Sequence, residues 1–133
     1  MRKKSSPSDR HSQAAHLHDM LESAESVARY MSGVTFEQFW NDCEKRDAVA
    51  LRLSMIGEAA CHVADKTAAA LPAVPFKAIR GMRNRITHDY GAIDFRIIWE
   101  VTQQDIAPLV AELSLHLTPG KAVAGETHDA TSP

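Results

Sequence analysis

The sequence predicts an all-α protein, built as an up-and-down bundle of four or five helices. Apolar residues recur at three- and four-residue spacing along most of the chain, which is the period of an amphipathic helix. Glycine, proline and capping residues fall where these stretches end. Almost no segment shows the two-residue alternation of a strand. Amphipathic helices with short connections pack as antiparallel neighbours around one core, which favours a bundle.

Size and composition are those of a single soluble domain. The 133 residues are 44% hydrophobic and 24% charged, as in an ordinary globular protein. No apolar run approaches the length of a membrane span, and the basic N-terminus lacks the apolar core of a secretion signal. We therefore expect a cytoplasmic protein with no membrane partner. The formal net charge of −2 argues against a protein that coats nucleic acid through bulk electrostatics.

The expected organisation is one helical domain over residues 10–117 between two tails. Residues 1–9 form a basic tail, and residues 118–133 are rich in Gly, Thr, Ala and Pro without an apolar period. Both tails are expected to be disordered and to contribute nothing to the fold.

The first predicted helix covers residues 11–32. Its apolar positions follow the helical period: Leu17, Leu21, Ala24, Val27, Ala28 and Met31. Gly33 is the expected C-terminal stop. Thr35 and Gln38 then predict a capping box, in which the side chain of each accepts a hydrogen bond from the backbone amide of the other.

The second helical stretch covers residues 36–70, with a break expected near residues 45–46. Gly57 lies inside it, where glycine costs about 1 kcal/mol relative to alanine, so we expect another helix to approach closely there. Cys43 and Cys61 are interpreted as packing residues. The apolar face consists of Phe36, Phe39, Trp40, Val49, Leu53, Ile56, Ala60, Val63 and Ala64.

Two further helices complete the predicted bundle. Pro72 and Pro75 end the second stretch and introduce the third helix, whose apolar face consists of Phe76, Ile79, Met82 and Ile86. The fourth helix begins at Asp94, a good N-cap residue, and continues to about residue 117. Pro108 inside it predicts a kink or local break.

The segment over residues 81–90 concentrates side chains suited to RNA chemistry. Arg83 offers a planar fork of N–H donors that matches two phosphate oxygens. His88 carries the side chain that suits proton transfer near neutral pH. Metal-independent RNA cleavage needs one group to move protons and another to hold the charge of the crowded phosphate. Arg80 and Arg85 make the segment a localised anion site and are expected to support binding of the RNA phosphate.

The spacing of Arg83 and His88 leaves alternatives open. Positions five apart on a regular helix lie about 140° apart around its axis, so the two side chains do not share a face. Either the helix loosens near His88, before Gly91, or two copies of the segment meet across a dimer. The other interpretation is structural: Arg83 caps a neighbouring helix or pairs with an acid such as Glu58, and His88 is a surface residue.

No other constellation points to chemistry. The sequence contains no Gly-rich phosphate loop, nucleophile elbow or paired-cysteine metal spacing. No metal site or other cofactor is expected, because His11, His16 and His18 lie near one tail without a second cluster of ligands.

These residues resemble those of the HepT-like HEPN toxins. The family signature is R-x-x-x-x-H-x-Y, and it occurs here as Arg83-Asn84-Arg85-Ile86-Thr87-His88-Asp89-Tyr90. The likeness extends from the first helix to about Leu113. It includes the stretches Ile56-Gly57-Glu58-Ala59 and Asp94 to Trp99. Relatives often have an aromatic residue after the motif tyrosine, where this chain has Gly91.

The resemblance implies a homodimeric ribonuclease toxin in which two motifs face one cleft. Arg83 and His88 would be catalytic, with Asn84 supporting the site, and the substrate would be an RNA such as tRNA or mRNA. The implied partner is an MntA-like nucleotidyltransferase antitoxin, which silences the toxin by attaching AMP to the motif tyrosine, here Tyr90. Glu58 matches a family position to which we assign no role.

Two other functions remain open from the sequence. The chain could be a non-catalytic regulatory or substrate-binding partner of a minimal nucleotidyltransferase, with the basic segment in contact with the nucleotide or the partner. A purely structural dimeric bundle is the third interpretation.

Overall fold

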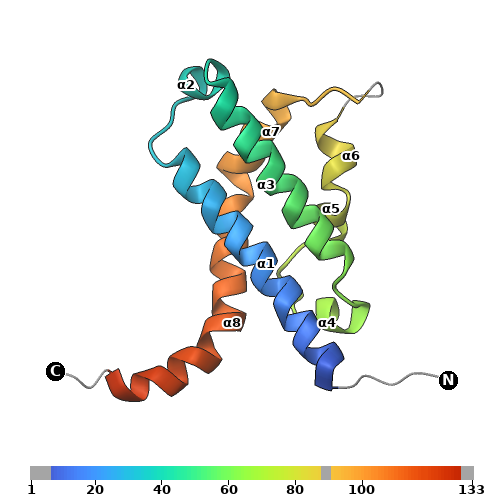
Figure 1. The fold of residues 1–133 in the computed structure, drawn as a ribbon, viewed down its shortest axis with the longest axis vertical. Coiled ribbons are helices and arrows are strands. Elements are labelled where there is room, and N and C mark those ends of the chain that lie inside the picture. Colours follow the sequence, from blue (N-terminus) through green and yellow to red (C-terminus); the bar gives the residue numbers. More distant parts are fainter. Residues whose placement is uncertain (1–6, 88–90, 130–133) are drawn as a thin grey trace.

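The computed structural model describes residues 7–87 and 91–129, and the side chains of residues 12–87 and 91–117. This part of the chain is helical, with one isolated bridge and no strand, so the all-α prediction is confirmed. The helices are α1 (Pro7–Met31), α2 (Phe36–Trp40), α3 (Cys43–Cys61), α4 (Asp65–Ala69), α5 (Phe76–Arg80), α6 (Met82–Ile86), α7 (Phe95–Gln104) and α8 (Ile106–Asp129). Figure 1 shows α1 and α5–α6 running opposite to α3 and α8, as in an up-and-down bundle.

One hydrophobic core lies between the long helices. The helix α1 packs against both α3 and α8, and α3 also contacts α5 and α6. The apolar period predicted from the sequence identifies many of the residues that fill this core. Buried members include Leu17, Met20, Ala24, Val27, Val49, Leu53, Ile56, Ala60, Ile79, Ile86, Ile98, Val101 and Leu113.

The predicted signals between α1 and α2 are confirmed. Gly33 has a φ of 72°, the left-handed conformation that glycine adopts without strain. The Thr35 hydroxyl accepts from the Gln38 amide at 3.1 Å, and the Gln38 side chain accepts from the Thr35 amide at 2.9 Å. Both halves of the capping box are therefore present.

The predicted break near residues 45–46 is wrong, because those residues lie inside α3. The chain breaks earlier, at Asn41 and Asp42, where the Asp42 side chain accepts from the Lys45 amide at 3.0 Å and caps α3. The two cysteines at the ends of α3 were predicted to pack, but Cys43 and Cys61 are both exposed.

Close approach at Gly57 is confirmed. A Cβ atom on Gly57 would lie 3.2 Å from the carbonyl oxygen of Ile79 and 3.5 Å from the Cβ of Met82. Glycine therefore lets α3 contact the segment that contains α5 and α6. That segment was predicted as one helix, and the structure divides it at Gly81.

The predicted break associated with Pro108 is also confirmed. Asp94 caps α7, accepting from the backbone amides of Arg96 and Ile97. The helix α7 ends at Gln104, four residues before Pro108. Proline has no N–H to donate to the carbonyl oxygen of Gln104, and its ring clashes with that carbonyl, so the helix cannot continue through this point. The helix α8 continues to Asp129, past residue 117 where the sequence predicts a tail to begin; the division into a domain and two tails stays a prediction. No described helix has the length and apolar character needed to cross a membrane.

Candidate active site

The short helix α6 presents Arg83 and Asn84 on the surface beside α3. Met82 and Ile86 of the same helix are buried in the core, and they hold α6 in place. Arg83 and Asn84 point the other way and are exposed. Because Gly57 allows α3 to approach closely at Met82, Arg83 lies next to the exposed face of α3.

Helix α6 ends before His88. Thr87 is already extended, with a φ of −119° and a ψ of 150°, and its hydroxyl donates to the carbonyl oxygen of Arg83 at 2.8 Å. An isolated bridge joins Thr87 to Ile93. The 140° separation of a regular helix therefore does not apply beyond Ile86, in agreement with the first of the two alternatives from the sequence.

The loop that follows turns back immediately. The amide of Asp94 donates to the carbonyl oxygen of Ile86 at 2.7 Å, so the chain returns to the end of α6 within eight residues. Gly91 has a φ of 89°, which a residue with a side chain adopts only under strain. The predicted site residues His88 and Tyr90 lie outside the described residues.

Arg83 lines a small groove of about 160 Å³, here called the motif groove. Among the described residues, its guanidinium has no hydrogen bond and no ion pair. The Glu58 carboxylate lies in the same groove but bonds His62 at 3.1 Å instead. The interpretation in which Arg83 caps a helix or pairs with Glu58 is therefore wrong. The groove is lined by Ser54, Gly57, Glu58, Cys61, Arg80, Arg83 and Asn84.

Arg80 also reaches the motif groove, but most of its donors are used by the fold. Its Nε donates to the carbonyl oxygen of Ala60 at 3.0 Å, and a terminal nitrogen donates to that of Val63 at 2.7 Å. Ala60 lies in the last turn of α3 and Val63 lies two residues past its end, where a positive charge is favourable. A longer contact of 3.7 Å joins Arg80 to Asp65.

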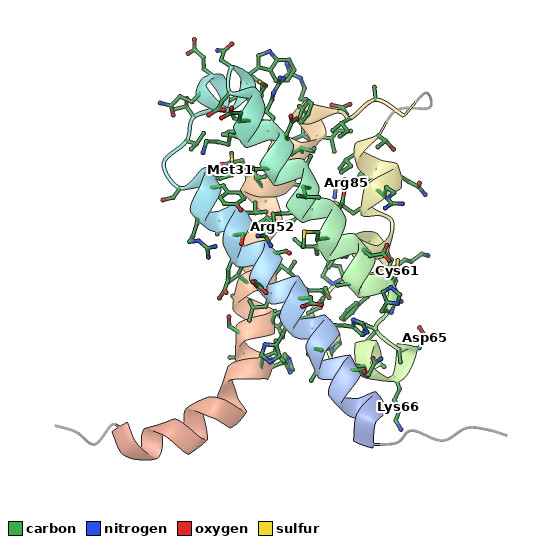
Figure 2. All side chains as sticks on the ribbon, in the orientation of Figure 1. Met31, Arg52, Cys61, Asp65, Lys66 and Arg85 are labelled. Atoms are coloured by element: carbon green, nitrogen blue, oxygen red, sulfur yellow. The ribbon has the colours of Figure 1, made fainter. Side chains whose placement is uncertain are left out.

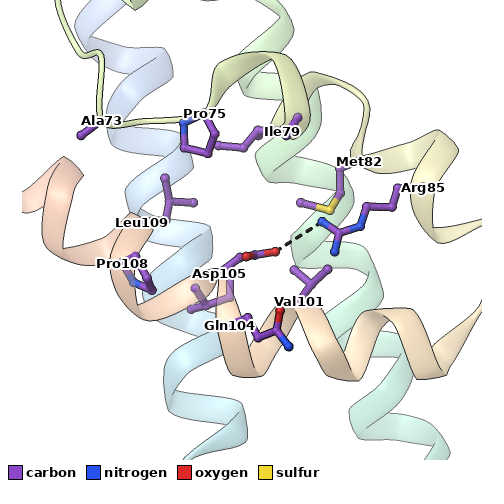
Figure 3. Close-up of a pocket in the computed structure, with 12 residues that line it drawn as sticks. Ala73, Pro75, Ile79, Met82, Arg85, Val101, Gln104, Asp105, Pro108 and Leu109 are labelled. Atoms are coloured by element: carbon purple, nitrogen blue, oxygen red, sulfur yellow. Dashed lines mark hydrogen bonds and ion pairs between the residues drawn. The ribbon is translucent and has the colours of Figure 1, made fainter.

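Arg85 lies on the opposite side of α6 from Arg83, because residues two apart on a helix point about 200° apart. Its guanidinium pairs with Asp105, at the junction of α7 and α8, at 3.3 Å. Figure 3 shows this pair at the edge of an apolar pocket of about 360 Å³ between α5–α6 and α7–α8. In Figure 2, Arg85 lies on α6, whereas Cys61, which lines the motif groove, lies at the end of α3. The structure thus brings Asn84 and Arg80, but not Arg85, to the groove beside Arg83.

A second, larger groove of about 590 Å³ lies between α1 and α3 and shares Ser54, Glu58 and Arg83 with the motif groove. We call it the α1–α3 groove. One residue of this groove, His62, contacts both Glu58 and His16, and the sequence did not identify it as a site residue. The i,i+4 spacing of Glu58 and His62 was a possible signal. The other lining residues are His16, Asp19, Glu22, Ser23, Leu51, Arg52, Met55 and Ala59.

Two further observations limit the site. Within the described ranges, no group of three or more His, Cys, Asp or Glu side chains could hold a metal ion. Arg96 of α7 lies over the rings of Phe36 and Trp40, at 5.1 and 5.6 Å from their centroids. It is therefore not a member of either groove.

Several known proteins are similar in sequence to this chain. The family model "Ribonuclease HepT-like" matches residues 20–115. The Methanocaldococcus jannaschii protein "Putative RNase MJ1380" is 32% identical over 101 residues, which are 76% of this chain and 93% of that one. "Probable ribonuclease HepT" of Thermococcus cleftensis is 29% identical over 94 residues, or 71% of this chain and 86% of that one. No solved structure matches.

Proposed function

The chain belongs to the Ribonuclease HepT-like family, and we propose that it is the toxin of a toxin–antitoxin pair that cleaves RNA with Arg83 and His88. The observation that carries this proposal is the guanidinium of Arg83, which is exposed in the motif groove and has no hydrogen bond or ion pair with the described residues. An arginine without a protein partner keeps its fork of donors available for a phosphate. The neighbouring Asn84 is also exposed in this groove, and its side-chain amide adds a donor.

The proposed reaction is a transesterification that needs no metal. The 2′-oxygen of a ribose attacks the adjacent phosphorus and the bond from phosphorus to the 5′-oxygen breaks. The 2′-hydroxyl loses a proton and the leaving 5′-oxygen gains one; His88 carries out one of these two transfers, as base or as acid, and water the other. Arg83 holds the added negative charge of the pentacoordinate phosphate, and Asn84 orients one of its oxygens. The products carry a 2′,3′-cyclic phosphate and a 5′-hydroxyl.

A homodimer is part of this proposal. Leu51 and Met55 of α3 are 60% and 43% exposed, and both line the α1–α3 groove. The acidic residue Asp19 and the basic residue Arg52 flank them, so the face carries charges of both signs and can pair with itself across a two-fold axis. Such a dimer would bring two copies of Arg83 to one cleft.

An MntA-like nucleotidyltransferase is the proposed antitoxin, acting by transfer of AMP to Tyr90. Family resemblance supports this step, and physical reasoning agrees, since a bulky anion two residues from His88 would compete with the RNA phosphate. The adduct should be found by mass spectrometry on protein produced together with an MntA-like nucleotidyltransferase, and it should be absent from Tyr90→Phe.

The direct test is RNA cleavage by the purified chain, free of its partner, in the presence of EDTA. Arg83→Ala should lower kcat/KM by about 100-fold or more, the loss expected when a donor to a developing oxyanion is removed. His88→Ala should lower it by about 100- to 10,000-fold, as for a general acid or base. Arg29→Ala is the matched control, because Arg29 is exposed on α1 and is absent from both grooves.

Two outcomes would contradict the assignment. One is cleavage by Arg83→Ala or His88→Ala as fast as by the parent. The other is a parent protein that is inert towards tRNA and total RNA but still binds the nucleotidyltransferase, which would favour the non-catalytic partner instead.

A further inference from the structure

His62 is an exposed residue that the fold holds in place. The Gln13 side chain binds the backbone on both sides of Val63. It donates to the carbonyl oxygen of His62 at 3.2 Å and accepts from the amide of Ala64 at 2.7 Å. From the other side, Arg80 donates to the carbonyl oxygens of Ala60 and Val63. The end of α3 is thus tied both to α1 and to α5.

The imidazole ring of His62 is oriented as well. Its Nε2 lies 3.1 Å from a carboxylate oxygen of Glu58. The ring of His16 stacks on it, with the centroids 5.2 Å apart and the planes 23° apart. The His62 side chain nevertheless stays 56% exposed. Contacts from two helices therefore hold a flat ring that remains accessible in the α1–α3 groove.

The composition of the α1–α3 groove fits a neutral, flat ligand better than an anion. The formal charges that line it nearly cancel, since the carboxylates of Asp19, Glu22 and Glu58 are opposed by the guanidiniums of Arg52 and Arg83, so the groove as a whole does not select an anion. Leu51 and Met55 line the same groove about three and two turns before His62 along α3, and they belong to the proposed dimer face, not to this site. The whole groove has a volume of about 590 Å³, within the range of small-molecule sites. Unstacked RNA bases stack on flat aromatic rings such as those of His62 and His16.

We infer that the part of the α1–α3 groove beside His62 and His16 is a nucleobase subsite in which a base of the RNA strand stacks on His62. The inference rests on the proposed function, since Arg83 at the edge of this groove would hold the phosphate of the same strand. Glu58 and His16 are then positioning residues that fix the plane of the His62 ring. The subsite helps to choose which position along a single strand reaches Arg83.

The test measures affinity for a single-stranded RNA oligonucleotide whose 2′-oxygens are methylated, so that it cannot be cleaved. His62→Leu should weaken binding by roughly fivefold or more, since base stacking on an aromatic side chain contributes at least that much. His62→Phe keeps a flat ring and should bind within about twofold of the parent. Circular dichroism checks that both variants fold.

The chain offers a matched control in His116, which makes the same i,i+4 contact, with Glu112, at 3.2 Å on α8. His116→Leu should bind the oligonucleotide like the parent. The inference is overturned if His62→Leu binds as tightly as the parent, or if His62→Phe loses as much affinity as His62→Leu. Because binding is measured without cleavage, a parent that binds but does not cleave contradicts only the proposed function.

Discussion

Arg80 and Arg83, three positions apart, have different surroundings. Arg80 donates to two carbonyls at the end of α3, whereas Arg83 is exposed and unpaired within the described part of the chain. The sequence identified Arg83 through its motif but placed Arg80 at the phosphate as well. The carbonyls that Arg80 binds are 17 and 20 residues away, so this capping depends on tertiary structure that local patterns do not contain.

This difference predicts that a change at Arg80 lowers stability, whereas a change at Arg83 lowers RNA cleavage and leaves stability nearly unchanged. Arg80→Gln should lower the free energy of unfolding by about 1.5–3 kcal/mol, the usual contribution of hydrogen bonds from a charged group. Arg83→Gln removes no contact within the described residues and should change it by less than about 0.5 kcal/mol, while cleavage falls. Urea unfolding of both variants checks this; a large stability loss in Arg83→Gln would indicate a structural role instead.

At the scale of the elements, signals that act within a few residues were the most predictable. The capping box at Thr35, the stop at Gly33 and the cap at Asp94 all depend on contacts close in sequence, and all are confirmed. The break before α3 was misplaced because the Asp42 cap was overlooked. The division at Gly81 was missed because the apolar face continues across it, from Ile79 to Met82.

Two glycines with positive φ allow a matched test of the motif loop. Gly91 and Gly33 have φ values of 89° and 72°, and a Cβ on either would meet nothing within 4 Å. Alanine at each should therefore cost about 1–2 kcal/mol through backbone strain alone. Gly91→Ala should also lower RNA cleavage, because it alters the backbone three residues after His88, whereas Gly33→Ala should leave cleavage intact. Equal rates of RNA cleavage by the two variants would contradict a role for the backbone at Gly91 in cleavage.

At the scale of the whole molecule, the bundle was predictable and the grooves were not. Helical periodicity shows which face of each helix is buried, and that determines much of the packing. It does not show that His16 of α1 stacks on His62, the C-cap residue of α3, which is 46 positions away. For the same reason Leu51 and Met55 were not recognised as an exposed apolar face.

The proposed dimer face predicts an effect on assembly. Leu51→Arg places a charge on this apolar surface and should shift the protein from dimer to monomer in sedimentation, with loss of cleavage, because the cleft would need both copies. Leu115 of α8 is similarly exposed, at 63%, and lies outside the α1–α3 groove. Leu115→Arg should therefore remain dimeric. A Leu51→Arg protein that stays dimeric would exclude this face.

The central claim is that Arg83 and His88 act on the same phosphodiester. The most direct measurement is kcat/KM for Arg83→Ala, His88→Ala and the double variant on one RNA in EDTA. Residues that act as a unit on one transition state show strongly non-additive losses. We predict that kcat/KM of the double variant lies within about tenfold of the value for the slower single variant. Losses that multiply in full would show that the two side chains act independently, and would contradict the account.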